Sequence, residues 1–132
     1  MRGSKTSSVL EALHAVAAQH RELTLLVLFG SRARGEGSPN ADWDFGFLAN
    51  GPLDSLQLMA ALAEVVGSER LDLVNLARAS GLLRYRTARD GMVVYEAQAG
   101  IFDRFRFEAA RFWCDAEPVL RLEYDTILDR LG

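Results

Sequence analysis

Residues 23–48 read LTLLVLFGSRARGEGSPNADWDFGFL, and their first part, Leu23 to Phe29, is an apolar run that stops at a glycine. A run of this length that ends in a turn residue predicts a buried strand. The Gly30-Ser31 pair then predicts a sharp turn, in which the backbone can approach a ligand closely and the amides and serine hydroxyl can point at phosphate oxygens. Two arginines add positive charge beside this turn. The expected phosphate-binding residues are Gly30, Ser31, Arg32 and Arg34.

The second half of the stretch carries a pair of carboxylates. Residues 35–40, GEGSPN, are rich in turn residues and predict a return to a second strand from Trp43 to Leu48. Asp42 and Asp44 fall on one face of that strand, and the aromatic residues fall on the other, where they can pack. Carboxylates at i and i+2 have α-carbons roughly 7 Å apart, so both can reach the same pair of metal ions. Their repulsion raises the pKa of the pair until Mg²⁺, which binds carboxylate and phosphate oxygens, relieves it.

A third carboxylate is expected on a neighbouring strand, because activation of an attacking hydroxyl requires a base. Asp72 interrupts the apolar, strand-like run RLDLVNL at residues 70–76, where an acid costs free energy unless it is paired or binds a metal. In a two-metal site, one ion steadies the triphosphate and leaving group, and the other lowers the pKa of the nucleophile. The alternative, that Asp72 faces solvent at a sheet edge, stays open. The expected catalytic and metal-binding residues are Asp42, Asp44 and Asp72.

Together these residues resemble the minimal nucleotidyltransferases of the DNA polymerase β-like superfamily, especially the MNT antitoxins that are encoded beside HEPN-domain toxins. The likeness covers nearly the whole chain. Gly30 and Ser31, ten further residues, and then Asp42 and Asp44 match the superfamily's Gly-Ser and Asp-x-Asp pattern. Asp72 matches its third carboxylate.

The resemblance implies a nucleotidyltransferase fold in which Asp42 and Asp44 hold Mg²⁺, Asp72 completes the metal site and acts toward the nucleophile, and the Gly-Ser turn binds phosphates. It also implies that AMP passes from ATP to a tyrosine hydroxyl of a HEPN-domain toxin, which silences the toxin. Two alternatives stay open. The chain could bind and occlude the toxin without chemistry, or transfer a nucleotide to a small-molecule hydroxyl such as that of an aminoglycoside, although little sequence is left for an acceptor domain.

The chain departs from the family pattern at two positions. Ala41 stands where the family usually has serine, and Gly46 stands where a larger side chain is more common. Neither change removes a ligand, so they concern catalytic efficiency rather than the fold. Further along, Arg84-Tyr85-Arg86 before Asp90-Gly91 resembles the family's downstream helix and turn. It stays open whether this trio contacts nucleotide or partner, or forms a charged helix face around a buried tyrosine.

Composition sets further bounds. With 132 residues, 49% of them hydrophobic, the chain is expected to form a single domain, residues 1–132, with one core. A formal charge of −3, from 15 basic and 18 acidic residues, argues against general nucleic-acid binding. No apolar run approaches the roughly 20 residues that cross a bilayer, and no cleavable signal is visible, so a cytoplasmic protein without membrane contact is expected. One cysteine, Cys114, excludes an internal disulfide.

The order of expected elements places the chain in the α/β or α+β class, with a small mixed sheet covered by helices. A capping box at Ser8 and Glu11 predicts a helix that runs to about His20. Further helices are expected from Leu53 to Val66, ended by Gly67, and from about Ser80 to Arg89, and a last strand from Met92 to Tyr95.

The C-terminal third is expected to be helical. An apolar stripe at helical spacing predicts packing against the domain, and it comprises Ile101, Phe102, Phe105, Ala109, Phe112 and Trp113. Phe107 projects from the opposite side, as part of an interface or as an ordinary surface residue. A second helix is expected after Pro118. The expected partners are a nucleoside triphosphate and a HEPN-domain toxin; homo- or hetero-oligomeric assembly is left open.

Overall fold

The computed structural model describes the backbone of residues 2–35 and 41–115, and the side chains of residues 8–35 and 41–112. The helices and strands in this part follow in the order α1 (Arg2–Ala18), β1 (Leu23–Phe29), β2 (Trp43–Ala49), α2 (Ser55–Val66), β3 (Leu71–Asn75), α3 (Gly81–Asp90), β4 (Met92–Glu96) and α4 (Ile101–Asp115). Among the described helices, none is both long and apolar enough to cross a membrane.

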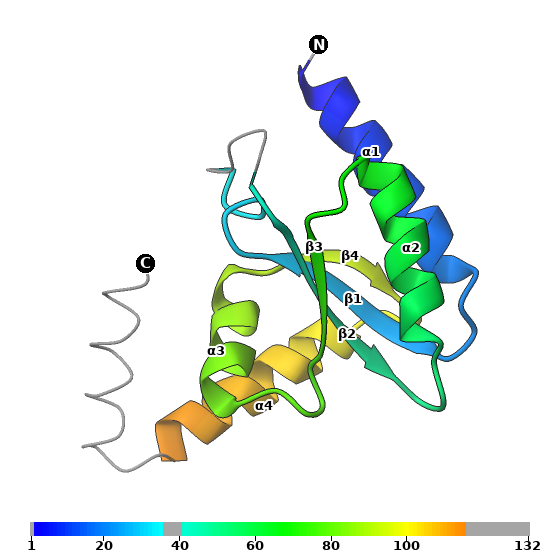
Figure 1. Ribbon diagram of the computed structural model, residues 1–132. Helices are drawn as coiled ribbons and strands as arrows, with labels where there is room; N and C mark the ends of the chain where they lie inside the picture. Colours follow the sequence, from blue (N-terminus) through cyan, green and yellow to red (C-terminus); the bar gives the residue numbers. More distant parts are fainter. Residues whose placement is uncertain (1, 36–40, 116–132) are drawn as a thin grey trace.

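The strands form one mixed sheet in the order β3-β2-β1-β4. Strand β1 pairs antiparallel with both β2 and β4, whereas β2 pairs parallel with β3. Helices α1 and α2 pack together over one face of the sheet, and α3 and α4 pack together over the other (Figure 1). The prediction of a small mixed sheet covered by helices is therefore confirmed.

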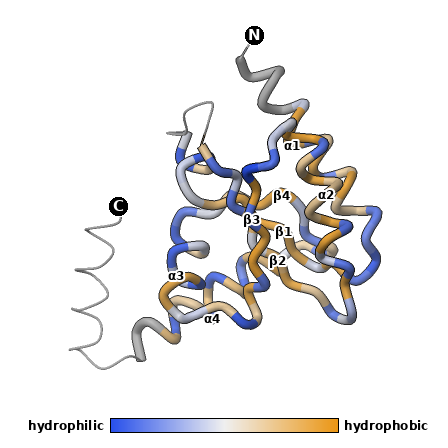
Figure 2. The backbone as a smooth tube through the Cα atoms, in the orientation of Figure 1, coloured by the Kyte–Doolittle hydropathy of each residue, from blue (hydrophilic) through white to orange (hydrophobic). Residues whose placement is uncertain are grey.

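Strand β1 lies at the centre of the sheet and is buried on both faces. Leu26 and Leu28 belong to the apolar core under α1 and α2, and Leu25 and Val27 belong to the core under α3 and α4. Because neither face of this strand contacts solvent, neither needs polar residues, and this explains the continuous apolar run. Figure 2 shows the resulting band of hydrophobic residues through the middle of the molecule.

The boundaries of α2 follow from its caps. The side chain of Asp54 accepts a hydrogen bond of 3.1 Å from the backbone amide of Gln57, which satisfies a free amide in the first turn and starts the helix at Ser55 rather than at Leu53. Gly67 ends the helix in the left-handed region, with φ of 68°, as predicted. Ser80 caps α3 in the same way, by accepting from the amide of Leu83.

The prediction of a capping box at Ser8 is wrong, because α1 is already helical from Arg2. Ser8 and Glu11 are both exposed within this helix. A Ser-x-x-Glu pattern is favoured at a helix start, but it also occurs on the solvent-exposed face of a helix interior. Here the helix continues through the preceding residues, so the pattern does not mark its start.

Helix α4 confirms most of the predicted apolar stripe. Phe102, Phe105 and Ala109 are buried against the sheet, and Phe107 is 67% exposed on the other side. Phe112 is 54% exposed and so departs from the prediction, because its ring lies over Gly81 at the start of α3 instead of inside the core. The side chains of Trp113 and Cys114, and the helix expected after Pro118, lie outside the described residues.

The glycine at position 46 is explained by the packing of β2. A methyl group on Gly46 would lie 2.8 Å from Cδ2 and 2.9 Å from Cγ of Leu76, whose side chain is fully buried.

We predict that Gly46→Ala lowers the free energy of unfolding by about 1–3 kcal/mol, since overpacking forces a core side chain to move. Urea denaturation measures this change. In a Leu76→Ala background the same substitution should cost much less, and an equal cost in both backgrounds would contradict this explanation.

Candidate active site

The pairing of β2 with β3 brings two of the predicted acids together. Asp44 and Asp72 are register partners in this parallel pair. Neighbouring strands lie about 4.8 Å apart, and partners in register point to the same face of the sheet. That face is the one covered by α3 and α4, because the alternating residues Phe45 and Phe47 of β2 belong to the core on the opposite side.

Asp42 directly precedes β2 and lies near the same point. Asp44 is half-buried, and Asp42 and Asp72 are exposed. The pKa of the Asp44 carboxyl is raised, first by burial and then by repulsion from the charges of Asp72 and Asp42, while Arg86 opposes the shift. The three carboxylates therefore share one electrostatic environment, as expected for acids that await a cation.

The fit to a metal depends on the donor set. Within the described residues, no group of three or more His, Cys, Asp or Glu side chains already converges on one point. The predicted ligands are carboxylates, which favours a hard cation such as Mg²⁺ over zinc. Asp72 is exposed on the edge strand β3, as the alternative of a solvent-facing acid predicts. The same residue is also the register partner of Asp44. The ligand roles of the three acids stay predictions.

The Gly-Ser turn lies against Asp44. Phe29, the last residue of β1, pairs with Asp44, so Gly30 follows at the level of that carboxylate. Gly30 has φ of +77°, and a methyl group there would lie 2.5 Å from Oδ2 of Asp44. The turn is closed by the amide of Arg34, which donates to the Gly30 carbonyl at 3.3 Å. Position 30 therefore needs glycine both for its backbone conformation and for its distance from the acid.

The two arginines of the turn contact the protein. Nη2 of Arg32 donates to the carbonyl of Ala41 at 2.9 Å, and its guanidinium carbon lies 4.4 Å from the centre of the Trp43 ring. These contacts tie the turn to both neighbours of Asp42. The phosphate-binding role of Arg32 is not tested by these contacts and stays a prediction.

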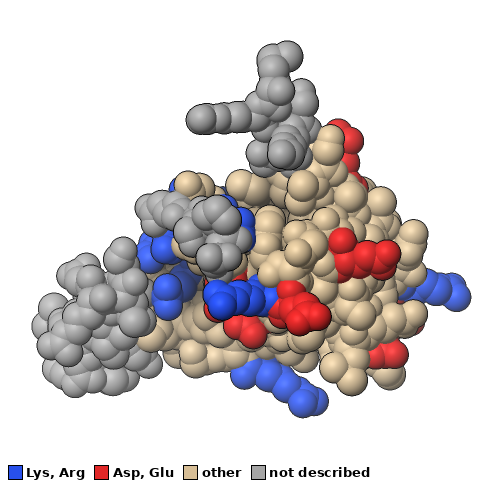
Figure 3. Space-filling model, turned by 45° about the horizontal axis from the view of Figure 1, so that its top comes forward, with Lys and Arg blue, Asp and Glu red and all other residues tan. Residues whose placement is uncertain are grey.

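Arg34 connects the turn to α3, which sequence reasoning did not foresee. Its Nη1 lies 3.9 Å from Oδ2 of Asp90, the last residue of α3. The pKa of Asp90 is lowered, chiefly by its hydrogen bond to Arg89 and by the charges of Arg89, Arg34 and Arg86. Figure 3 shows basic and acidic side chains close together in the middle of one face of the molecule. The sequence predicts a helix and turn at Asp90, but only the folded chain brings this residue to the loop.

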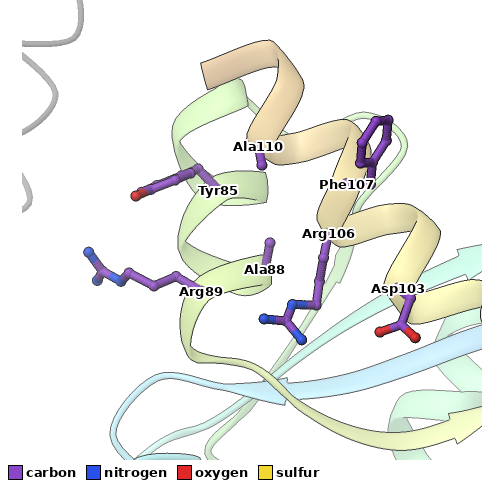
Figure 4. Close-up of a pocket in the computed structure, with 7 residues that line it drawn as sticks. All are labelled: Tyr85, Ala88, Arg89, Asp103, Arg106, Phe107 and Ala110. Carbon is purple, nitrogen blue, oxygen red and sulfur yellow. The ribbon is translucent and has the colours of Figure 1, made fainter. Parts of the chain in front are cut away.

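Two hollows lie near these elements. A groove of about 410 Å³ between α3 and α4 is lined by Tyr85, Ala88, Arg89, Asp103, Arg106, Phe107 and Ala110 (Figure 4). A second hollow of about 520 Å³ is lined by Arg32 and Trp43 together with residues 66–70. The second hollow adjoins the Gly-Ser turn through Arg32, whereas the lining of the first comes from α3 and α4.

The effect of the close approach of Gly30 to Asp44 on ligand affinity can be measured separately from the effect of backbone strain on folding stability. We predict that Gly30→Ala reduces the affinity for Mg²⁺ and a nucleoside triphosphate, because the methyl group displaces the Asp44 carboxylate. Gly35 is a matched control: it has φ of +72°, but a methyl group there meets nothing within 4 Å. Both variants should lose about 1–2 kcal/mol of folding stability, and isothermal titration calorimetry should show weaker ligand binding only for Gly30→Ala. Equal binding by both variants would contradict the role of Gly30.

The chain is similar to known proteins over the region that carries this site. Residues 11–99 match the protein family described as Polymerase beta, Nucleotidyltransferase. The chain is 38% identical over 96 residues to the protein adenylyltransferase MntA of Aphanizomenon flos-aquae (strain 2012/KM1/D3), with 64% of this chain covered. The match spans 64% of the length of that relative.

Solved structures of toxin–antitoxin systems have the same fold. A crystal structure of a toxin–antitoxin with AMP-PNP superimposes with a TM-score of 0.62 at 27% identity, over 83% of this chain and 86% of the other. A crystal structure of the toxin–antitoxin MntA-HepT gives 0.56 at 26% identity, over 83% and 84%. A structure of tri-AMPylated Shewanella oneidensis HEPN toxin with MNT antitoxin gives 0.60 at 23% identity, over 99% and 98%, which shows a shared fold alone.

Proposed function

The chain belongs to the polymerase beta nucleotidyltransferase family, and on that premise we propose that it is a Mg²⁺-dependent nucleotidyltransferase that acts on a partner protein. The observation that carries this proposal is the register of β2 with β3, which sets Asp72 beside Asp44. Gly30 lies against the same carboxylate, so the Gly-Ser turn lies next to the pair formed by Asp44 and Asp72. This combination is what transfer from a nucleoside triphosphate requires.

The Gly-Ser turn and the three acids have different proposed roles. Gly30 and Ser31 bind phosphate oxygens through backbone amides and the serine hydroxyl, with positive charge from the arginines that follow. Asp42, Asp44 and Asp72 would hold Mg²⁺, which neutralises charge on the triphosphate and the leaving group and lowers the pKa of the attacking hydroxyl.

The reaction is an in-line displacement at the α-phosphorus. The oxygen of the acceptor hydroxyl forms a bond to that phosphorus, and the bond to the oxygen that bridges to the β-phosphorus breaks. Its electron pair leaves with pyrophosphate, and the hydroxyl proton passes to Asp72. Asp72 is exposed on an edge strand, so a bulky acceptor can approach it from solvent. This openness favours a protein acceptor.

We assign the nucleotide and the partner from the relatives. The curated relative is named a protein adenylyltransferase, and the structure that superimposes with the TM-score of 0.62 is a toxin–antitoxin with AMP-PNP. We therefore propose that AMP is transferred from ATP, in the cytoplasm, to a tyrosine hydroxyl of a HEPN-domain toxin that is thereby silenced. The chain then acts as the antitoxin and forms at least a transient hetero-oligomer with that toxin.

The test uses the native chain, Mg²⁺, ATP labelled at the α-phosphate, and a purified HEPN-domain toxin. We predict that label is transferred to the toxin, that mass spectrometry finds AMP on a tyrosine, and that chelation of Mg²⁺ stops the reaction. ATP labelled at the γ-phosphate should transfer nothing. The double variant Asp42→Asn, Asp44→Asn should lose activity by about 100-fold or more, since charge stabilisation in the transition state is removed.

Glu64→Gln is the matched control, because Glu64 is an exposed acid on α2, which covers the opposite face of the sheet. Its transfer rate should equal that of the native chain. Undiminished silencing of the toxin by the Asp42, Asp44 double variant, without label transfer, would instead identify the chain as an occluding antitoxin. Transfer to a small hydroxyl compound but not to the toxin would contradict the protein acceptor.

A further inference from the structure

We propose that Arg86 of α3 is a further substrate-binding residue, whose guanidinium contacts the phosphates of the nucleoside triphosphate beside Asp44. The inference rests on the proposed function, since it places a cation at the site where that substrate would bind. It assigns the nucleotide contact that was left open for the Arg84-Tyr85-Arg86 trio to Arg86.

The position of Arg86 follows from how α3 ends. Asp90, the last residue of the helix, lies 3.9 Å from Arg34 of the Gly-Ser turn, so this end of α3 reaches the turn. Arg86 comes one helical turn earlier. Residues at i and i+4 share a helix face, so Arg86 is on the same side of α3 as the contact with the turn.

The charge of Arg86 acts on two acids from different elements. It lowers the pKa of Asp44, on β2, against the larger effects of burial and neighbouring carboxylates, and it contributes to the lowered pKa of Asp90. Arg86 is therefore within electrostatic range of both carboxylates, which agrees with its place on the side of α3 that meets the Gly-Ser turn.

The other arginines of α3 have different environments. Nη2 of Arg84 lies 3.9 Å from Glu108 of α4, and its guanidinium lies over the Phe105 ring. Arg89 donates to Asp90 through Nε and Nη2, at 3.0 and 2.8 Å, and lines the groove between α3 and α4 together with Tyr85 (Figure 4).

Arg86 is half-buried, and its side chain forms no hydrogen bond or ion pair within the described part of the chain. Its side-chain donors are therefore not occupied by either Asp44 or Asp90. A guanidinium offers several donors in a fixed plane, which suits phosphate oxygens. Three carboxylates together with a triphosphate carry more negative charge than two divalent cations can neutralise, so an added cation stabilises the bound substrate.

The experiment compares Arg86→Gln with Arg84→Gln, which removes the same charge from the same helix on the side that faces α4. We predict that Arg86→Gln binds Mg²⁺ and a non-hydrolysable ATP analogue about 10- to 100-fold more weakly than the native chain. Adenosine affinity should not change, because adenosine has no phosphates. Arg86→Lys should recover part of the loss. Calorimetry measures the affinities, and thermal unfolding verifies that each variant is folded.

Unchanged affinity of Arg86→Gln for the ATP analogue would overturn the inference, and so would an equal loss in Arg84→Gln. A lower unfolding temperature with unchanged affinity would show that Arg86 only supports α3, and would also overturn it. These results are distinct from failure of the proposed function. A native chain that binds the analogue through Arg86 but transfers no AMP would refute the transferase and leave the contact intact.

Discussion

The repulsion among carboxylates at the start of β2 is the constraint on which the site depends. Parallel pairing with β3 places Asp72 in register with Asp44, and Asp42 lies two residues away along the chain. Such an arrangement costs free energy in the absence of a cation. Burial, which is the larger cause, and this repulsion together raise the pKa of Asp44. Groups with perturbed pKa values cluster at functional sites.

The rest of the architecture holds this group in place. Strand β1 is buried on both faces and pairs with β2 up to the level of Asp44, so the Gly-Ser turn emerges next to the acids. Arg32 then fixes the turn to the residues on both sides of Asp42, and Arg34 fixes it to the end of α3. Apolar packing thus sets the strand register, and polar contacts set the position of the turn.

Much of this arrangement could be predicted from the sequence, because it depends on local patterns. A buried run that ends in glycine defines β1, alternation separates Asp44 from Phe45 in β2, and a left-handed glycine ends α2. The parts that could not be predicted depend on contacts between distant segments. The pairing of Arg34 with Asp90 and the turn of Phe112 toward Gly81 have no local signal, and the motif at Ser8 is compatible with both a helix start and a helix interior.

The pKa of Asp44 is the most direct measure of whether the acids act on one another. Because it is raised in the folded chain, the ionised carboxylate disfavours folding: the contribution of Asp44 to stability is fully present below its unfolded pKa and is lost as pH rises through the folded pKa. NMR titration of the aspartate carboxyl carbons in metal-free buffer should show that Asp72→Asn lowers the pKa of Asp44, whereas Glu64→Gln leaves it unchanged. A pKa of Asp44 that is the same in the native chain and in Asp72→Asn would contradict the shared site.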